Sequence, residues 1–158
     1  MRIKSLIDED FVNYKKPSMF LSACFCDWKC CKEAGVDVCI CQNADAYNME
    51  IVNIPDDTIV KRYVANDITK AIVIGGFEPF LQFDELYSLV RKFRENTNDD
   101  IIIYTGFYRR EVEKEVKKLS EFDNVYIKFG RYVPNGKKHF DELLGIYLAN
   151  EEQKAEKI

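Results

Sequence analysis

Six cysteines, the only ones in the chain, lie within twenty consecutive residues, CFCDWKCCKEAGVDVCICQN (24–43). Thiolates are favoured ligands of zinc and of iron–sulfur clusters. In a cytosolic protein thiols stay reduced, so a crowded set of cysteines indicates a metal before it indicates disulfides. We therefore expect this stretch to bind a metal ion or a metal cluster.

The spacing of the cysteines favours a cluster over zinc. Four-cysteine zinc sites usually contain two Cys-x2-Cys pairs, and the chain has none. Three residues separate Cys26 from Cys30, and Cys41 follows Cys30 after a further ten residues. Three protein thiolates would leave one iron of a 4Fe–4S cluster open for chemistry, whereas four would be more typical of electron transfer. A domain that binds zinc for stability and serves in protein interaction remains an alternative to a cluster protein.

The elements that would position these cysteines alternate between strand and helix. Short β-branched runs predict buried strands, and apolar residues at helical spacing predict helices. We expect strands at 18–25, 70–76, 100–106, 124–130 and 144–149, and helices at 56–64, 83–93 and 108–122. This alternation predicts an α/β fold with a parallel sheet and right-handed crossovers. There are too few units for a closed eight-fold barrel, so we expect one domain over 1–158, an open sheet or a partial (β/α) barrel.

The candidate residues should meet at one edge of that sheet. The cysteine stretch follows the first expected strand, Gly75-Gly76 ends the second, and Thr105-Gly106 ends the third. The carboxyl ends of parallel strands lie at one edge, where ligands of such folds bind. We therefore expect a single site built from all three segments.

Three motifs of the chain point to one known family. They are the step from Cys26 to Cys30 with the CQN at 41–43, the strand end IVIGGFEPF (72–80) and the strand end IIIYTGF (101–107). They resemble the cysteine motif, the Gly-Gly-Glu-Pro strand end and the Tyr-Thr-Gly-aromatic strand end of the radical S-adenosylmethionine superfamily. The similarity is greatest to its short activating proteins of anaerobic ribonucleotide reductases, and it extends over most of the chain.

The chain departs from the family pattern in two places. Glu33 stands where the third cysteine of a Cys-x3-Cys-x2-Cys motif would be, so the longer loop must supply that ligand. Cys41 is the expected ligand, with Cys39 in reserve. Phe77 separates Gly76 from the glutamate of the second motif.

The resemblance implies a 4Fe–4S cluster on Cys26, Cys30 and Cys41, and S-adenosylmethionine as a second cofactor. The residues that it implies for that cofactor, whose ammonium group would meet the carboxylate, are Ile40, Gly75, Gly76, Glu78, Tyr104 and Thr105. Family members cleave the cofactor reductively to a 5′-deoxyadenosyl radical, which takes hydrogen from a glycine of a large partner enzyme. We therefore expect a cytoplasmic oxidoreductase with a partner such as an anaerobic ribonucleotide reductase, and a flavodoxin- or ferredoxin-like electron donor. No side chain is predicted to be catalytic.

Composition excludes several other classes. A net charge of −4 argues against a nucleic-acid surface, and no apolar run is long enough to span a bilayer. Hydrolase and nucleotide-triphosphatase motifs are missing. A non-catalytic iron–sulfur electron-transfer or redox-sensing module remains the main alternative. The basic stretch 128–140 is expected to form a solvated turn, and the polar segment 150–158 to be partly mobile.

Overall fold

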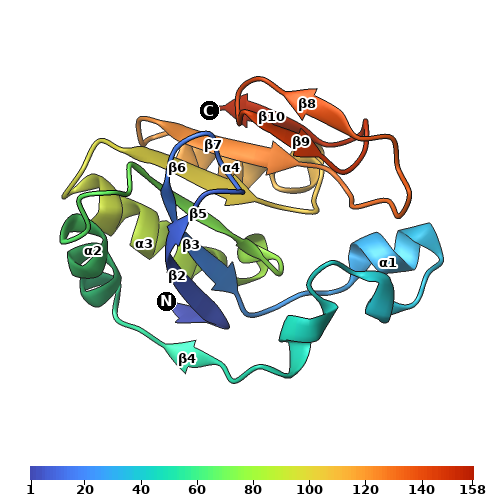
Figure 1. Ribbon diagram of the computed structural model, residues 1–158, viewed down its shortest axis with the longest axis horizontal. Helices are drawn as coiled ribbons and strands as arrows, with labels where there is room; N and C mark the ends of the chain where they lie inside the picture. The colour runs from blue at the N-terminus through green and yellow to red at the C-terminus, as the bar shows by residue number, and fades with distance from the viewer.

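A six-stranded sheet forms the centre of the computed structural model, which describes residues 1–158 (Figure 1). Its strand order is β10-β7-β6-β5-β3-β2. The four middle strands run parallel: β3 (Ser18–Ala23), β5 (Ala71–Gly76), β6 (Asp100–Tyr104) and β7 (Val125–Phe129). The two edge strands, β2 (Ser5–Asp10) and β10 (Lys154–Lys157), pair antiparallel with their neighbours.

Three crossover helices cover one face of the sheet: α2 (Asp56–Val64), α3 (Phe83–Arg94) and α4 (Glu113–Leu119). In α3 the buried residues recur at helical spacing: Leu86, Leu89, Val90 and Phe93. Its first turn is acidic and its last turn is basic, which complements the helix dipole. These helices bury the larger of two hydrophobic cores, to which alternate strand residues such as Ile72 and Ile74 contribute.

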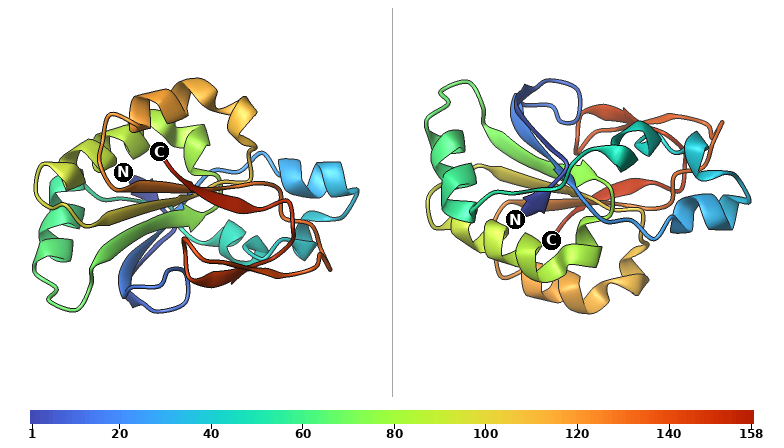
Figure 2. Two further views of the ribbon diagram at one scale, coloured as in Figure 1. Left: turned by 90° about the horizontal axis from the view of Figure 1, so that it is seen from above. Right: turned by 90° about the horizontal axis from the view of Figure 1, so that it is seen from below.

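The opposite face of the sheet carries a smaller core. Ala71, Val73 and Ile102 point to this side, because successive side chains of a strand alternate between faces. A hairpin of β8 (His139–Asp141) and β9 (Ile146–Leu148) contributes Leu148 to its cover. Figure 2 shows α3 and α4 on one side of the sheet and this hairpin on the other.

Shorter elements extend from the carboxyl edge and frame the sheet. The cysteine stretch contains α1 (Lys29–Ala34) and the 3-10 turn η1 (Val38–Ile40), and η2 (Ala44–Asn48) follows it. Figure 1 shows these elements beyond the ends of the parallel strands. The turns η3 (Pro79–Gln82) and η4 (Arg109–Glu111) follow β5 and β6, and β1 (Arg2–Ile3) pairs with β4 (Val52–Asn53).

The expected α/β fold with a mostly parallel sheet is confirmed, and the sheet is open. No closed barrel is present, and a barrel of the radical S-adenosylmethionine type is not observed. The segment 144–149 contributes β9 to a separate hairpin instead of a strand to the main sheet. The helix expected at 108–122 is split into η4 and the shorter α4.

The prediction of a partly mobile segment at 150–158 is wrong for residues 154–157. Residues 154–157 form β10, whose backbone pairs with β7 in a register that sets Ala155 opposite Lys128. A strand at the edge of a sheet pairs along one flank and packs on one face, so it can be rich in polar residues. The polar composition of this segment therefore gave no sign of a strand. None of the helices has the length and apolar character that crossing a membrane requires.

Candidate metal centre

A cavity of about 330 Å³ lies at the carboxyl edge of the sheet, between the cysteine stretch and the strand ends. Four thiols line it: Cys26, Cys30, Cys31 and Cys41. Gly76, Glu78, Thr105 and Gly106 line it from the ends of β5 and β6. The three segments that the sequence placed at one edge therefore meet in one cavity.

Local backbone geometry directs the four thiols. Trp28 takes a left-handed conformation (φ 59°) and turns the chain after Cys26 into α1, which carries Cys30 and Cys31. The Trp28 amide donates to Cys26 Sγ at 3.3 Å, and the Asn43 amide donates to Cys41 Sγ at 3.5 Å. Amide donors of this kind stabilise negative charge on sulfur.

Burial raises the pKa of Cys26, Cys30 and Cys31 and so favours their protonated form in the metal-free protein. It raises the pKa of Cys26 to about 12, against a weaker opposing effect from the Trp28 amide. It also raises the pKa of Cys30 and of Cys31, whose thiol in addition interacts with Cys41. Thiolate ligands must lose these protons, so metal loading of this site is coupled to proton release.

The other two cysteines lie elsewhere. The backbone amide and the thiol of Cys24 both donate to Gln82 Oε1, at 2.9 and 3.2 Å, and Cys24 is buried outside the cavity. Cys39 is exposed on η1 and faces a different pocket. The six cysteines thus divide into four at the cavity and two away from it, and the choice of ligands among the four stays a prediction.

The shape of the cavity and its donor set fit a group larger than a single ion. No three His, Cys, Asp or Glu side chains converge closely enough to bind one metal ion. A cluster holds its thiolates further apart than a zinc ion does, which matches four thiols spread around a cavity. A Cβ atom on Gly106 would lie 2.7 Å from Cys30 Sγ, so glycine is needed where the end of β6 approaches this sulfur.

Glu78 crosslinks the ends of β5 and β6 at the floor of the cavity. Its carboxylate accepts hydrogen bonds from the Thr105 hydroxyl (2.8 Å), the Gly106 amide (2.9 Å) and the Phe80 amide (3.2 Å). The residue is only 5% exposed. Burial raises the pKa of Glu78 to about 7, although these donors and Lys128 oppose the shift.

Asn43 ties the cysteine stretch to the Gly-Gly strand end. Its side-chain amide donates to the Gly76 carbonyl at 2.5 Å. Gly76 itself has φ 75°, and a Cβ there would lie 2.1 Å from Ser22 Oγ, so only glycine fits. This link brings together the two motifs on which the sequence argument depended most.

The remaining residues predicted for the second cofactor lie at different distances from the site. Tyr104 lines the cavity, and its hydroxyl donates to the Asn13 carbonyl. Ile40 is 48% exposed and does not line the cavity. Gly75 does not line the cavity, and a Cβ atom on it would lie 3.2 Å from Tyr104 Cβ.

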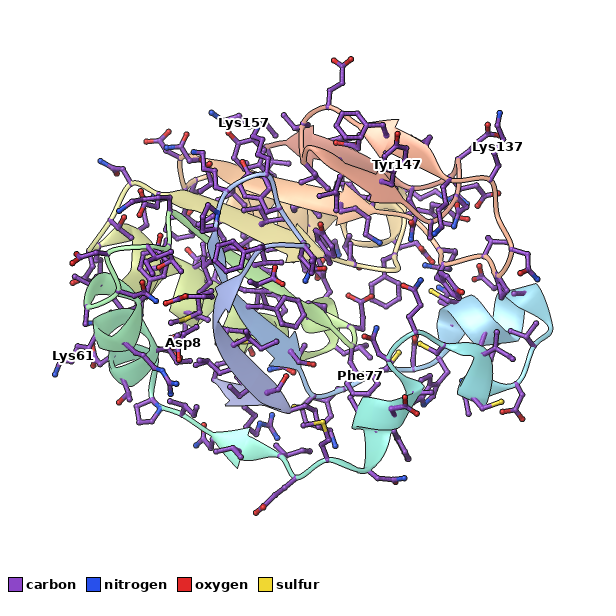
Figure 3. All side chains as sticks on the ribbon, viewed as in Figure 1. Asp8, Lys61, Phe77, Lys137, Tyr147 and Lys157 are labelled. Atoms are coloured by element: carbon purple, nitrogen blue, oxygen red, sulfur yellow. The ribbon has the colours of Figure 1, made fainter.

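Phe77, the residue that interrupts the second motif, anchors the cysteine stretch. It is buried at the position labelled in Figure 3, and its ring meets the Trp28 ring edge-on with centroids 5.6 Å apart. Tyr47 contacts Trp28 in a similar way at 5.4 Å. Aromatic pairs of this geometry stabilise beyond the area that they bury, so Phe77 and Tyr47 hold Trp28 in place.

The prediction of a solvated turn at 128–140 is wrong at its beginning. Lys128 belongs to β7, is buried and lines the cavity. Its ammonium group lies 5.5 Å from the centre of the Tyr104 ring, and burial lowers its pKa to about 8. The alternation of β7 could have revealed it, because Lys128 stands between Ile127 and Phe129, which face the other core.

Arg131 is the second buried cation that the sequence argument missed. Its guanidinium donates to both carboxylate oxygens of Glu33, at 2.8 and 3.1 Å, and to Glu111 at 2.7 Å. It also donates to the Gly106 carbonyl. Arg131 therefore fastens α1, through Glu33, to the ends of β6 and β7.

A family model described as "4Fe-4S single cluster domain" matches residues 16–145. The matched span begins just before β3 and includes all six cysteines and the cavity residues at the ends of β5 and β6. No curated protein and no solved structure matches the chain.

Proposed function

The chain belongs to the 4Fe-4S single cluster domain family. We propose that it uses the cluster to cleave S-adenosylmethionine reductively, as an activating enzyme does. Membership of this family makes the chain a 4Fe–4S cluster-binding domain. The observation that carries the proposal is the shared cavity, where four thiols face the ends of β5 and β6.

Cys26, Cys30 and Cys41 would hold the cluster, with one iron left open. When bound and reduced, such a cluster supplies the electron that breaks a carbon–sulfur bond of the sulfonium, which yields methionine and a 5′-deoxyadenosyl radical. The protein contributes binding, orientation and exclusion of water.

Two buried charges in the cavity suit the amino-acid part of the cofactor. A carboxylate has about four acceptor positions, and Glu78 uses three of them, which leaves one for an ammonium group. Lys128 lines the same cavity, makes no hydrogen bond through its ammonium group, and suits the carboxylate of methionine. An arriving ammonium group would favour the ionised form of Glu78.

The substrate in this proposal is a large protein, such as an anaerobic ribonucleotide reductase, and the electron donor is flavodoxin- or ferredoxin-like. Val12 and Tyr147 line the cavity, and both are more than two-thirds exposed. Exposed apolar side chains beside the cavity suit contact with another protein. The compartment in this proposal is the cytoplasm, where thiols stay reduced.

A second candidate function is electron transfer or redox sensing. Cys31 favours it, because this buried thiol lines the same cavity and is not needed when three ligands suffice. Four cysteine ligands would leave no open iron for S-adenosylmethionine.

Anaerobic reconstitution separates the two candidates. We expect protein loaded with iron and sulfide to bind S-adenosylmethionine and, with dithionite, to release 5′-deoxyadenosine. Glu78→Gln should keep the cluster and weaken cofactor binding by roughly ten- to a hundredfold, the usual cost of a lost charge-assisted hydrogen bond. If loaded wild-type protein neither binds nor cleaves the cofactor, the cleavage proposal is wrong and electron transfer or redox sensing is the supported function.

A further inference from the structure

The segment from Glu33 to Val60 carries six acidic residues and no lysine, arginine or histidine. It also exposes an unusual amount of apolar surface. Of the fourteen exposed large hydrophobic residues in the chain, six lie between positions 38 and 52: Val38, Ile40, Tyr47, Met49, Ile51 and Val52. Each is 42–59% exposed. Acidic character and exposed apolar side chains therefore coincide on one part of the surface, residues 37–52, which we call the acidic–apolar surface.

A pocket of about 470 Å³ opens within this surface. Trp28 forms one wall, and Val38 and Tyr47 contribute further apolar walls. The Trp28 and Tyr47 rings meet at 63° with centroids 5.4 Å apart, which leaves an aromatic corner. Trp28 also lines the cluster cavity, so the pocket and the cluster site share a single ring as a partition.

One charged side chain, Asp45, lines this pocket. Asp45 is exposed and takes part in no ion pair or side-chain hydrogen bond. Lys4 reaches this region from the N-terminal strands, but its ammonium group is used by the carbonyls of Tyr47 and Met49. The carboxylate is therefore free for an external cation.

Aromatic faces beside a carboxylate select a planar cation on an apolar stem. A guanidinium group stacks on aromatic rings and pairs with carboxylates in a fixed geometry. We propose that the acidic–apolar surface docks a protein partner, which inserts an arginine side chain between Trp28, Tyr47 and Asp45. Apolar residues of the partner then pack against Val38, Ile40 and Met49. This inference does not depend on the cleavage of S-adenosylmethionine.

Charge decides between this occupant and others. The three acids of the surface, Asp37, Asp45 and Glu50, repel an acidic partner or a nucleic acid and attract a basic segment. Such attraction weakens with salt, because exposed charges are screened over a Debye length. A basic, apolar partner should therefore bind more weakly as ionic strength rises.

Two synthetic peptides test the surface: acetyl-Ala-Leu-Arg-Leu-Arg-Leu-Ala-amide, and a matched peptide with glutamate at both arginine positions. Each is titrated anaerobically into the cluster-loaded protein by calorimetry, at about 0.05 M and about 0.3 M salt. We expect binding of the arginine peptide only, and weaker binding at the higher salt. Trp28 is the only tryptophan, so a change in its fluorescence emission reports occupancy of the pocket directly.

Variants locate the binding. Asp45→Asn should lower the affinity for the arginine peptide by about threefold, and Tyr47→Ala should lower it by about three- to tenfold. Glu142→Gln and Phe11→Ala are matched controls, since both side chains are exposed and lie outside this surface, and they should bind the peptide as wild type does. Release of 5′-deoxyadenosine should be unchanged in Asp45→Asn, so the docking inference and the proposed function fail separately.

Four outcomes would overturn the inference. They are no binding of the arginine peptide at millimolar concentration, equal binding of the glutamate peptide, equal losses in the control variants, and dimerisation of the protein that Tyr47→Ala abolishes. The last outcome would mean that a second copy of this chain, and not a basic partner, occupies the surface.

Discussion

The sheet and the cysteine stretch are stabilised in different ways. Ile72, Leu89 and Ile101 have no exposed surface, and the larger core unites the parallel strands with three helices. Between residues 24 and 51, by contrast, only Cys24 and Cys31 are buried. The sheet is stabilised by apolar burial, while the cysteine stretch depends on a few specific contacts. The sheet can therefore be stable on its own, while the cysteine stretch stays weakly held until the metal is bound.

Beside the hydrogen bonds of Cys24 and Phe25 and the Lys29–Glu111 ion pair, three further contacts hold the cysteine stretch against the sheet. They are the Arg131–Glu33 ion pair, the hydrogen bond from Asn43 to Gly76, and the Phe77–Trp28 aromatic contact. Contacts of these kinds typically stabilise by about 1 kcal/mol each. The metal centre is expected to supply the rest when it is bound.

The largest expected effect is complete loss of the cluster with little change in the sheet. Serine at Cys26, Cys30 or Cys41 should abolish the brown chromophore and the bound iron of the reconstituted protein, because each change removes a thiolate ligand. Far-ultraviolet circular dichroism should be unchanged, since the core does not include these residues.

Cysteines away from the cavity provide the control for that series. Cys24→Ser and Cys39→Ser should retain the cluster, and so should Cys31→Ser when three thiolates suffice. Loss in Cys31→Ser alone among these would favour four ligands and electron transfer. Equal loss at all six positions would contradict the division of the cysteines into four and two.

Damage to the core should have the opposite signature. Leu89→Ala in α3 removes a fully buried side chain and should lower the free energy of unfolding by about 2–5 kcal/mol. The iron content per folded molecule should stay at the wild-type level. Denaturant unfolding and iron analysis measure the two quantities, with Leu81→Ala, which is 44% exposed, as the control. A matching loss of iron would show that the two regions are not separable.

The free energy of unfolding of the metal-free protein should depend on pH through Glu78, which lines the cavity between the two regions. The pKa of Glu78 is raised from 4.5 to about 7 by burial, so the folded state binds the proton more tightly than the unfolded chain. This contribution to stability is fully present below about pH 4.5 and is lost as the pH rises through 7. It amounts to about 3 kcal/mol at most. Unfolding of the metal-free protein at several pH values should lose this dependence in Glu78→Gln, and a dependence that persists would assign it to another group.

The smallest expected effect comes from the ion pair that fastens α1. Glu33→Gln removes the charge opposite Arg131, but Glu33 is half-exposed, so the free energy of unfolding should fall by less than about 1 kcal/mol. Loss of iron to a chelator should become about two- to fivefold faster, because α1 carries two of the thiols.

The Arg62–Asp8 pair is a matched control for this change. It is also bidentate, with distances of 2.5 and 2.6 Å, and Asp8 lies far from α1 (Figure 3). Asp8→Asn should leave the rate of iron loss at the wild-type value. A similar acceleration in both variants would deny Glu33 a specific role in positioning α1.

The sequence predicted the parallel strands well because each is buried on both faces. Runs such as IVI at 72–74 and III at 101–103 have no polar interruption, so their composition identifies them. The edge strands β2 and β10 contain SLIDED and KAEK, whose polar residues resemble a loop. Their pairing depends on neighbours that are remote in sequence, which no local pattern contains.

The candidate site was predictable where motifs mark it and not where packing decides. Cys26, Cys30 and Cys41 were identified from spacing and resemblance, and all three line the cavity. Cys31 joins them because of the orientation of α1, which depends on the left-handed turn at Trp28. Arg131 was missed because an arginine is expected at the surface unless its carboxylate partners are known. Here the partners lie on α1 and η4, which are remote from it in sequence.

The cysteines are synthesised before several other residues that line the cavity, so the cavity cannot form until most of the chain has been made. The cysteines end at Cys41, whereas Lys128 and Gln153, which line the opposite wall, are synthesised about a hundred residues later. At ordinary translation rates this interval is roughly 5–20 s. During it the thiols have left the ribosome without the walls that will bury them. We therefore expect them to be most vulnerable to oxidation at that stage, and cluster insertion to follow the completion of β7 and β10.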